Sequence, residues 1–90
     1  MTTASATITV QNRLGMHARP AMLFAEAAGR FSADITVSHA EAAPVDAKSI
    51  MQLMMLAATK GTSLLITAEG DDANEAVDEL ASLVQDNFNE

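Results

Sequence analysis

The sequence predicts an α+β fold, an open-faced sandwich in which a four-stranded antiparallel sheet is covered on one face by three helices. Two patterns lead to this prediction: some short segments alternate apolar and polar residues, and others repeat apolar residues at helical spacing. The predicted order is β-α-β-β-α-β-α, and stacking the helices on one sheet buries both kinds of apolar pattern together. The 90 residues show no linker, repeat or low-complexity segment, which indicates one domain over residues 1–90.

The first half of the chain alternates in two places. In the first of these, alternation directs Ile8 and Val10 inward. Pro20 suits a first helical turn because its missing N–H has no partner there, and Gly29 weakens the helix near its end. The predicted elements are a strand at 6–11, a loop at 12–17, a helix with the apolar residues Ala21, Phe24, Ala25 and Ala28, a strand at 34–39, a turn at 40–44 and a short strand at 45–47.

The second half is predicted to add two helices and one strand. The predicted elements are a helix opened by Ser49 that runs from Ile50 to about Thr59 and ends at Lys60-Gly61, a strand at 63–68, a turn at 69–71 and a last helix. Asp72 and Glu75 resemble a cap for that helix. Its apolar stripe consists of Ala73, Ala76, Val77, Leu80, Ala81, Val84 and Phe88. The open sheet face is predicted to stay wet because it carries Thr7, Thr9, Thr36 and Thr67.

Composition and charge exclude several classes of function. A net charge of −7, with no base between residues 69 and 90, does not provide the broad basic face that nucleic acid requires, and three phenylalanines are a poor surface for stacking bases. No apolar run approaches the roughly 18–20 residues of a membrane span. Without cysteine and with only two histidines, no metal-ligand spacing is recognisable, and His39 is interpreted as a surface residue. The N-terminal residues lack a signal-peptide pattern, so we expect a cytoplasmic protein.

The segment 15–21 combines residues that suit phosphate chemistry. His17 lies where the predicted loop meets a helix start, whose unpaired N–H groups and positive dipole end attract phosphate. Arg19 adds a permanent charge that matches phosphate oxygens, and imidazole is a competent nucleophile near neutral pH. These parts would let His17 accept and hold a phosphoryl group, with Pro20 fixing the direction of the helix. The residues alone leave open that His17 is an ordinary polar loop residue.

Two motifs resemble one known family. Gly15-Met16-His17-Ala18-Arg19-Pro20-Ala21 resembles the active-centre motif of the histidine-containing phosphocarrier family, HPr, of the bacterial phosphotransferase system. Lys48-Ser49-Ile50-Met51 resembles the regulatory serine segment of the same family. The similarity in element order and motif placement extends over nearly the whole chain.

The resemblance implies a carrier rather than an enzyme. His17 would accept a phosphoryl group on Nδ1 from phosphorylated enzyme I, which takes it from phosphoenolpyruvate, and pass it to the A domains of sugar permeases. Arg19 would stabilise the phosphate, supported by a loop that includes Gly15, Ala18 and Pro20. We expect no cofactor, no metal, no nucleic acid and no membrane insertion, and a monomer that meets its partners transiently.

Ser49 has two interpretations. The spacing of Ser49 and Gln52 is that of a capping box, which alone explains a serine at a helix start. The resemblance adds regulation, because some family members are phosphorylated at this serine by an HPr kinase/phosphorylase. A phosphate at a helix N-terminus beside Lys48 would be electrostatically favourable.

The segment 50–56 is apolar at every position except Gln52, and a helix can turn only one stripe to the core. Some of these residues must therefore face water, where methionines form an adaptable docking surface. By resemblance, Ile50, Met51 and Met54, with Lys48 beside them, would meet enzyme I, permease domains and the serine kinase. Leu53 and Leu56 are then predicted to be core, and packing in the core remains the alternative for the rest.

The sequence departs from the family pattern in a few positions. Met16 stands where many relatives have leucine, Gln52 replaces a frequent glycine, and Ala57-Ala58 fills a stretch that often carries a glycine. The first helix has only Arg30 where enteric members carry several lysines. Docking to acidic surfaces would then depend on Arg19, Lys48 and the apolar patch, which leaves the identity of the partners open.

Two other functions stay open at this stage. One is a nitrogen-related or purely regulatory phosphorelay protein of the same family that is not coupled to sugar uptake. The other is a non-catalytic α+β interaction module, which predicts that His17→Ala leaves function intact. A self-contained enzyme is disfavoured, because one histidine and one arginine in an exposed loop provide no substrate pocket.

Overall fold

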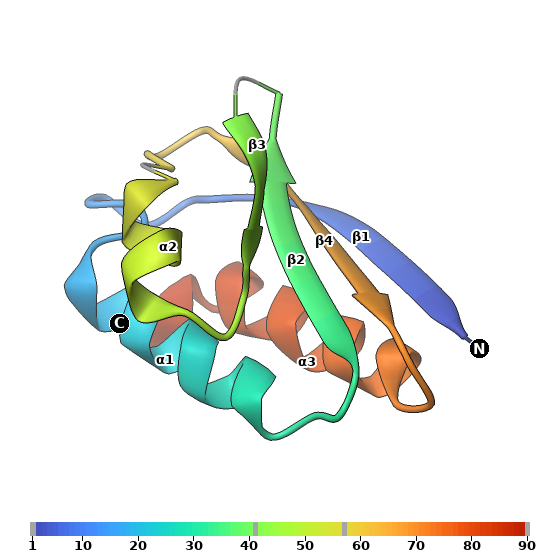
Figure 1. Cartoon of the computed structure of the whole chain (residues 1–90). Coiled ribbons are helices and arrows are strands. Elements are labelled where there is room, and N and C mark those ends of the chain that lie inside the picture. The colour runs from blue at the N-terminus through green and yellow to red at the C-terminus, as the bar shows by residue number, and fades with distance from the viewer. Residues whose placement is uncertain (1, 41, 57, 90) are drawn as a thin grey trace.

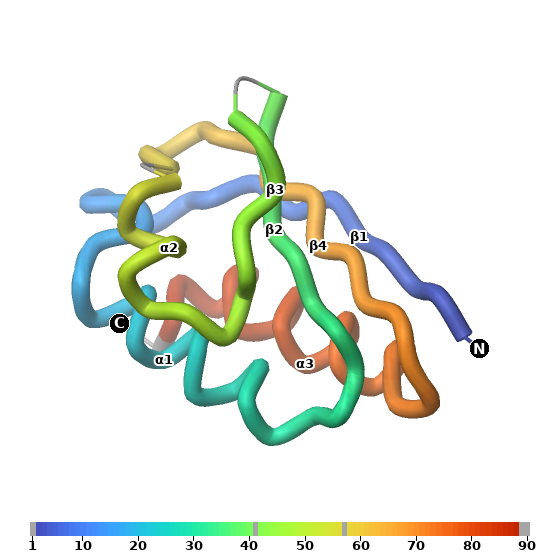
Figure 2. Tube along the Cα trace, viewed as in Figure 1, coloured from blue at the N-terminus to red at the C-terminus, as the bar shows by residue number. Residues whose placement is uncertain are grey.

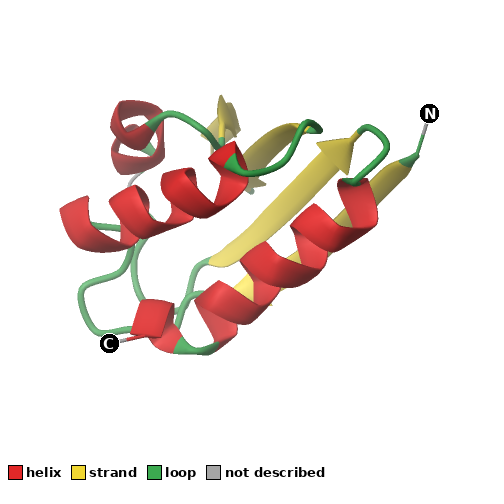
Figure 3. Cartoon of the chain, turned by 90° about the horizontal axis from the view of Figure 1, so that it is seen from below, coloured by secondary structure: helices red, strands yellow, loops and turns green. Residues whose placement is uncertain are grey.

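A computed structural model describes residues 2–40, 42–56 and 58–89. Its elements, shown in Figure 1, are β1 (Thr3–Thr9), α1 (Ala18–Gly29), β2 (Asp34–His39), β3 (Ala42–Asp46), α2 (Ile50–Met55), β4 (Ser63–Glu69), α3 (Ala73–Gln85) and the 3₁₀ turn η1 (Asn87–Asn89). The strands form one antiparallel sheet of four in the order β1-β4-β2-β3. The helices lie together on one face of it, as the view from below in Figure 3 shows, so the predicted fold class and element order are confirmed.

The strand order brings two distant loops to the same end of the sheet. β4 lies between β1 and β2, and its first residue, Ser63, pairs with Thr9 at the end of β1. Val10 donates to the carbonyl oxygen of Thr62 at 2.8 Å, and Gly61 donates back to Val10 at 2.8 Å. The trace in Figure 2 shows the two segments running side by side there. The loop that precedes α1 is therefore held against the segment that precedes β4.

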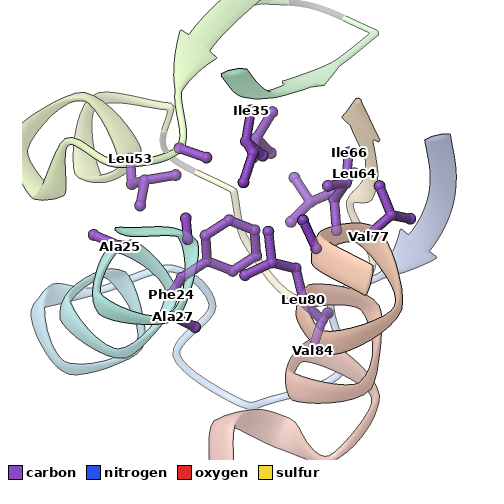
Figure 4. Packing of buried hydrophobic residues seen from close by; sticks show 14 of the residues in the cluster. Phe24, Ala25, Ala27, Ile35, Leu53, Leu64, Ile66, Val77, Leu80 and Val84 are labelled. Carbon is purple, nitrogen blue, oxygen red and sulfur yellow. The ribbon is translucent and has the colours of Figure 1, made fainter. Parts of the chain in front are cut away.

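The core lies between the sheet and the helices. Figure 4 shows Phe24 of α1 among side chains from the sheet and from both other helices. Phe24, Leu53 and Leu80 are fully buried, as are Leu64 and Ile66 of β4. On the opposite face of the sheet, three of the predicted threonines are exposed and Thr67 is half-buried. The alternating pattern of the strands thus separates a dry face from a wet one, as predicted.

The bounds of β1 and β3 differ from the sequence prediction. β1 covers Thr3–Thr9 rather than 6–11, and β3 covers Ala42–Asp46, where a turn at 40–44 and a strand at 45–47 were predicted. Pro44 lies within β3, which is tolerated because β3 is an edge strand and needs no donor from that residue on its outer side. Glu41, in the predicted turn, lies outside the described residues.

α2 is shorter than predicted. It ends at Met55 with Leu56 as its C-cap, and not near Thr59. Ala58 leaves the helical path because its carbonyl oxygen accepts a hydrogen bond from Met16 at 2.8 Å. A contact with the loop before α1 has replaced another helical turn. Ala57, also predicted to be helical, lies outside the described residues.

The start of α3 differs from the predicted cap. Asp72 is the N-cap residue, but its side chain makes no capping hydrogen bond. Its carboxylate instead accepts the backbone N–H groups of Ser32 at 2.8 Å and Ala33 at 2.9 Å, in the turn between α1 and β2. The bond from Ser32 contributes most to a lowered pKa of Asp72, and the bond from Ala33 adds to it. The carboxylate therefore joins α3 to a distant turn.

The end of α3 also differs. Phe88 was predicted on the stripe of the last helix, but the helix ends at Gln85 and Phe88 lies in η1. Asn87 and Phe88 have φ angles of 55° and 57°, a left-handed conformation that asparagine tolerates and that is unfavourable for phenylalanine. The backbone adopts it because the reversal carries the phenyl ring into the core, where it is fully buried. The prediction was right about burial and wrong about the element.

Candidate functional site

The loop before α1 is built around Gly15. Its φ of +67° is a left-handed conformation, and a Cβ at this position would overlap the carbonyl oxygen of Ala58 and lie 2.8 Å from the Cα of Thr59. Only glycine both adopts this φ readily and leaves room for the neighbouring backbone. The next residue, Met16, is 4% exposed and donates its N–H to Ala58. Glycine thus lets the loop lie directly against the segment that follows α2.

Asn12 organises the loop from inside and was missed by the sequence analysis. The side-chain Nδ2 of Asn12 donates to the carbonyl oxygen of Gly15 at 2.7 Å, and the backbone carbonyl oxygen of Asn12 accepts the N–H of Gly15 at 3.1 Å. The Gly15 carbonyl oxygen also accepts the N–H of His17 at 3.0 Å. An asparagine that precedes a glycine turn is a known turn signal, and this signal was available in the sequence.

His17 is the N-cap residue of α1, with an extended backbone and a half-buried side chain. Its carbonyl oxygen accepts the first helical hydrogen bond, from Ala21 at 3.0 Å. The side chain of His17 makes no capping hydrogen bond to the helix. Because Pro20 has no N–H, Ala18 and Arg19 are the residues of the first turn whose N–H groups have no acceptor within the helix.

The charge around this helix start is positive. Arg19 is exposed, and the first turn of α1 contains no acidic residue. The positive end of the helix dipole adds to the charge of Arg19. The structure therefore brings Gly15, His17, Ala18, Arg19 and Pro20 together as one site that suits an anion. Pro20 is the third residue of α1, in the first turn where it was predicted.

Ser49 begins α2 as a structural cap. Its Oγ accepts the N–H of Gln52 at 3.2 Å, as the capping box predicts. The reciprocal bond is absent, because Gln52 Oε1 accepts the N–H of Asp46 at 3.0 Å instead of that of Ser49. The N–H of Ser49 donates to the carbonyl oxygen of Asp46 at 3.1 Å. Half of the predicted capping box is therefore present, and Gln52 joins the end of β3 to the first turn of α2.

The structure does not bring Ser49 to His17. Lys48 Nζ donates to the carbonyl oxygen of Phe31 at 2.8 Å, just beyond the last residue of α1. The other end of the α2 segment meets the loop before α1 through Ala58. α2 therefore has its Ser49 end near the end of α1 and its far end near the beginning of α1, where His17 lies.

The exposed face of α2 forms an apolar patch. Ile50, Met51, Met54 and Met55 line a shallow hollow of about 500 Å³, which we call the α2 patch. Met55, which was not predicted as part of a docking surface, is the most exposed of them at 75%. Leu53 and Leu56 are buried, as predicted. Figure 1 shows α2 packed beside the first part of α1, so the patch lies on the same side of the sheet as His17.

The sequence analysis predicted that His39 is a simple surface residue, and the structure contradicts this prediction. Its side chain is half-buried at the end of β2, and its Nε2 lies 2.9 Å from the carbonyl oxygen of Leu56. This hydrogen bond joins the end of β2 to the end of α2. Among the described residues, no group of three or more acidic, histidine or cysteine side chains could hold a metal ion. Within the same residues, no helix has the length and apolar character to cross a bilayer.

Comparisons with known proteins identify the family of this chain. A family model described as the PTS HPr component phosphorylation site matches residues 4–86. Phosphocarrier protein HPr of Pseudomonas aeruginosa is 45% identical over 83 residues, which cover 92% of each chain. Phosphocarrier protein NPr of Proteus mirabilis is 35% identical, again over 92% of each chain.

Solved structures of HPr also superpose on this chain. HPr of Thermoanaerobacter tengcongensis superposes with a TM-score of 0.91 at 41% identity, over 97% of each chain. A structure of HPr from the same organism, described as a dimer, superposes with a TM-score of 0.77 at 42% identity, over 94% of this chain and 97% of that one. Members of this family are phosphocarrier proteins, and the chain belongs to it: it is a member of the HPr family of the bacterial phosphotransferase system.

Proposed function

We propose that this protein carries a phosphoryl group on Nδ1 of His17, which it accepts from phosphorylated enzyme I and passes to the A domains of sugar permeases. The observation that carries this proposal is the open start of α1. His17 caps the helix without a side-chain capping bond, and the N–H groups of Ala18 and Arg19 have no acceptor within the helix. These donors and the Arg19 guanidinium stabilise the charge of a phosphoryl group on the ring.

The transfer itself needs one nucleophilic nitrogen. The lone pair on Nδ1 of the neutral His17 ring forms the bond to phosphorus while the bond between phosphorus and the donor group of enzyme I breaks. The electron pair of the broken bond returns to the donor, and the proton of the ring stays on Nε2. Onward transfer is the same exchange in reverse, with a permease A domain as acceptor. The protein is therefore a carrier and a substrate of enzyme I, and its partner proteins are the catalysts.

A mass measurement tests this proposal. Incubation with phosphoenolpyruvate and enzyme I of the same host should add one phosphate, lost in mild acid, and His17→Ala should abolish the gain. Arg19→Ala should slow phosphorylation about 10- to 150-fold, because a hydrogen bond to a charged group contributes about 1.5–3 kcal/mol.

The control is Arg30→Ala, which removes the exposed arginine at the C-cap of α1, whose partner is Glu79 at 3.2 Å. It should change nothing in the transfer. No mass gain with an enzyme I that phosphorylates another HPr would refute the carrier function, and it would favour the non-catalytic interaction module.

The α2 patch is proposed as the docking surface for enzyme I and the permease domains, with Ile50, Met51 and Met54 as contacts and Lys48 beside them. Apolar side chains that are this exposed, gathered on one short helix beside α1, support the proposal. Met54→Ser should raise the KM of enzyme I for this protein about tenfold, the effect of one interface anchor, and leave kcat unchanged.

A matched control exists for this variant. Leu65 of β4 is 42% exposed, against 44% for Met54, and it lies on the sheet face away from the helices. Leu65→Ser should leave the KM unchanged. Equal effects of the two substitutions would mean that the α2 patch is not the docking surface.

Ser49 is proposed as a regulatory phosphorylation site for HPr kinase/phosphorylase. Support comes from its half-buried position at the start of α2 and from Lys48 beside it. A phosphate there would add negative charge at the edge of the docking surface and weaken its contact with a negative partner. Incubation with ATP and the kinase should add one acid-stable phosphate that Ser49→Ala abolishes. No gain with an active kinase would leave Ser49 as a structural cap alone.

A nitrogen-related phosphorelay remains the second candidate function. One observation favours it: after Arg19, α1 contains no lysine or arginine, and the arginine at its C-cap, Arg30, is paired with Glu79. Comparing kcat/KM with a sugar-type and a nitrogen-type enzyme I distinguishes the two functions, since a preference of tenfold or more identifies the branch.

We further propose that the carrier acts as a cytoplasmic monomer. Light scattering should then give the mass of one chain at micromolar concentration.

A further inference from the structure

Asn12 is unusual among the residues that the structure describes, because it is the one polar or charged residue that is buried. Its exposed fraction is 5%, and it lies in the loop that ends at His17. Its Nδ2 has a partner, but within the described part of the chain its Oδ1 is buried without a hydrogen bond. Burying an unpaired acceptor destabilises a protein, which offsets part of the stability that the Nδ2 hydrogen bond adds.

The partner of Asn12 is a peptide unit that is held at both of its ends. The carbonyl oxygen of Gly15 accepts from Asn12 Nδ2 at 2.7 Å and from the N–H of His17 at 3.0 Å. The N–H of Met16 belongs to the same peptide unit and donates to Ala58 at 2.8 Å. Three hydrogen bonds thus fix the plane of the peptide immediately before Met16 and His17.

Asn12 supplies the bond that the rest of the loop cannot replace. The left-handed φ of Gly15 places little steric limit on the rotation of the following peptide, because glycine has no Cβ. The hydrogen bond from Asn12 therefore orients the Gly15 carbonyl group from inside the loop. That orientation decides where the His17 N–H points, and with it the direction of the His17 Cβ and ring.

We propose that Asn12 is the positioning residue of the phosphoryl acceptor: its amide N–H orients the Gly15–Met16 peptide and thereby aims His17 at the incoming phosphoryl group. This inference rests on the proposed function of His17. Asn12 itself does not touch the phosphoryl group. It also lies on a different segment from the α2 patch, so its loss should slow the transfer step and leave docking unchanged.

The decisive variant is Asn12→Leu, which keeps a similar volume and removes both the donor and the unpaired acceptor. The Gly15 oxygen retains the His17 N–H, so no new unpaired group is buried and the thermal midpoint should not fall. The kcat for phosphorylation by enzyme I should fall about 10- to 100-fold, the range expected for misplacement of a reacting group by about an ångström. The KM should stay within a factor of two. Asn12→Ala should show the same loss of kcat.

Asn74→Leu, which changes an exposed asparagine on α3, is the matched control and should leave both kcat and KM unchanged.

A second readout separates this inference from the proposed function. In the nuclear magnetic resonance spectrum of the unphosphorylated protein, Asn12→Leu should shift the Met16 amide and the ring nitrogens of His17, and Asn74→Leu should not. An unchanged kcat in Asn12→Leu, while His17→Ala abolishes phosphorylation, refutes positioning by Asn12 and leaves the carrier function standing. If the wild-type protein accepts no phosphoryl group, the carrier function fails, and unchanged Met16 and His17 signals then refute the positioning role as well.

Discussion

The starts of α1 and α2 are two solutions to the same chemical problem. Each helix begins with N–H groups that have no acceptor within the helix. At α2 the chain satisfies one of them itself, because Ser49 Oγ accepts the N–H of Gln52 at 3.2 Å. At α1 the N-cap is His17, whose side chain makes no such bond, and the loop before it is shaped by Asn12 and Gly15.

This difference separates a structural helix start from the one that we propose is functional. α2 has only six residues, too few for a stable isolated helix, so it gains from an internal cap and from Gln52, which is bonded to Asp46. α1 has 12 residues and packs its apolar stripe into the core, so its stability depends less on a side-chain cap. A helix held by packing can spare its N-terminus for an anion, whereas a short helix uses its N-terminus for its own stability.

The largest effect on this comparison is expected from a change in the loop that shapes the start of α1. Gly15→Ala should lower the free energy of unfolding by about 2–5 kcal/mol, the sum of left-handed strain and a Cβ forced against backbone. It should also slow phosphorylation of His17. Chemical denaturation and the enzyme I assay measure the two effects.

Two other glycines provide the controls. Gly61 has a φ of +93°, and a Cβ added there would meet nothing within 4 Å, so Gly61→Ala should cost only the strain, about 1–2 kcal/mol. Gly29 ends α1 with the same open space and no positive φ, so Gly29→Ala should be neutral or stabilise slightly. If Gly15→Ala costs no more than Gly61→Ala, the contact with Ala58 does not shape the loop.

A smaller effect is expected at the other helix start. Ser49→Ala removes the acceptor of the Gln52 N–H and should lower the free energy of unfolding by about 0.5–2 kcal/mol, with unchanged phosphorylation of His17. Ser49→Asp keeps an acceptor at the cap and should recover most of the loss. Ser82→Ala, an exposed serine inside α3, should cost nothing. A reduced rate of His17 phosphorylation in Ser49→Ala at full stability would contradict the separation of the two helix starts.

The smallest effect concerns the third helix start, where the cap residue serves a distant turn. The bonds from Ser32 and Ala33 lower the pKa of Asp72, so the folded state favours the charged carboxylate more than the unfolded state does. Its stabilisation is therefore present above the unfolded pKa of about 3.9 and is lost as pH falls through the lower folded value.

Asp72→Asn should accordingly lower the thermal midpoint at pH 7, and the gap between the two proteins should narrow below pH 4. Asp71→Asn, at the exposed neighbouring position, should show no such gap at either pH. A gap for Asp72→Asn that stays constant down to pH 2.5 would mean that the charge of the carboxylate is not what joins α3 to the turn.

The predictions from sequence succeeded where the cause is local. The alternation in residues 34–39 predicted β2 with its observed bounds, and the spacing of apolar residues predicted the buried face of α1. The motif around His17 predicted a helix start that contains Pro20. Each of these features depends on neighbours in the chain, which a pattern records directly.

The predictions failed where distant groups compete with local ones. The capping box at Ser49 is only half formed because Gln52 finds the N–H of Asp46, and Asp72 turns away from its own helix toward Ser32. Asn12 was overlooked because an asparagine before a glycine turn is common, and nothing in the sequence marks it as buried.

The sequence by itself determined the fold class, the core stripes and the motif in which we propose that a phosphoryl group is carried. These depend on periodicity and on residue chemistry over a few neighbouring positions. Only the tertiary structure decided where α2 ends, which side chain orients the His17 loop, and how Phe88 returns to the core. The β1–β4 pairing brings the loop at Gly15 against Ala58, and such contacts arise only when segments far apart in sequence are packed together.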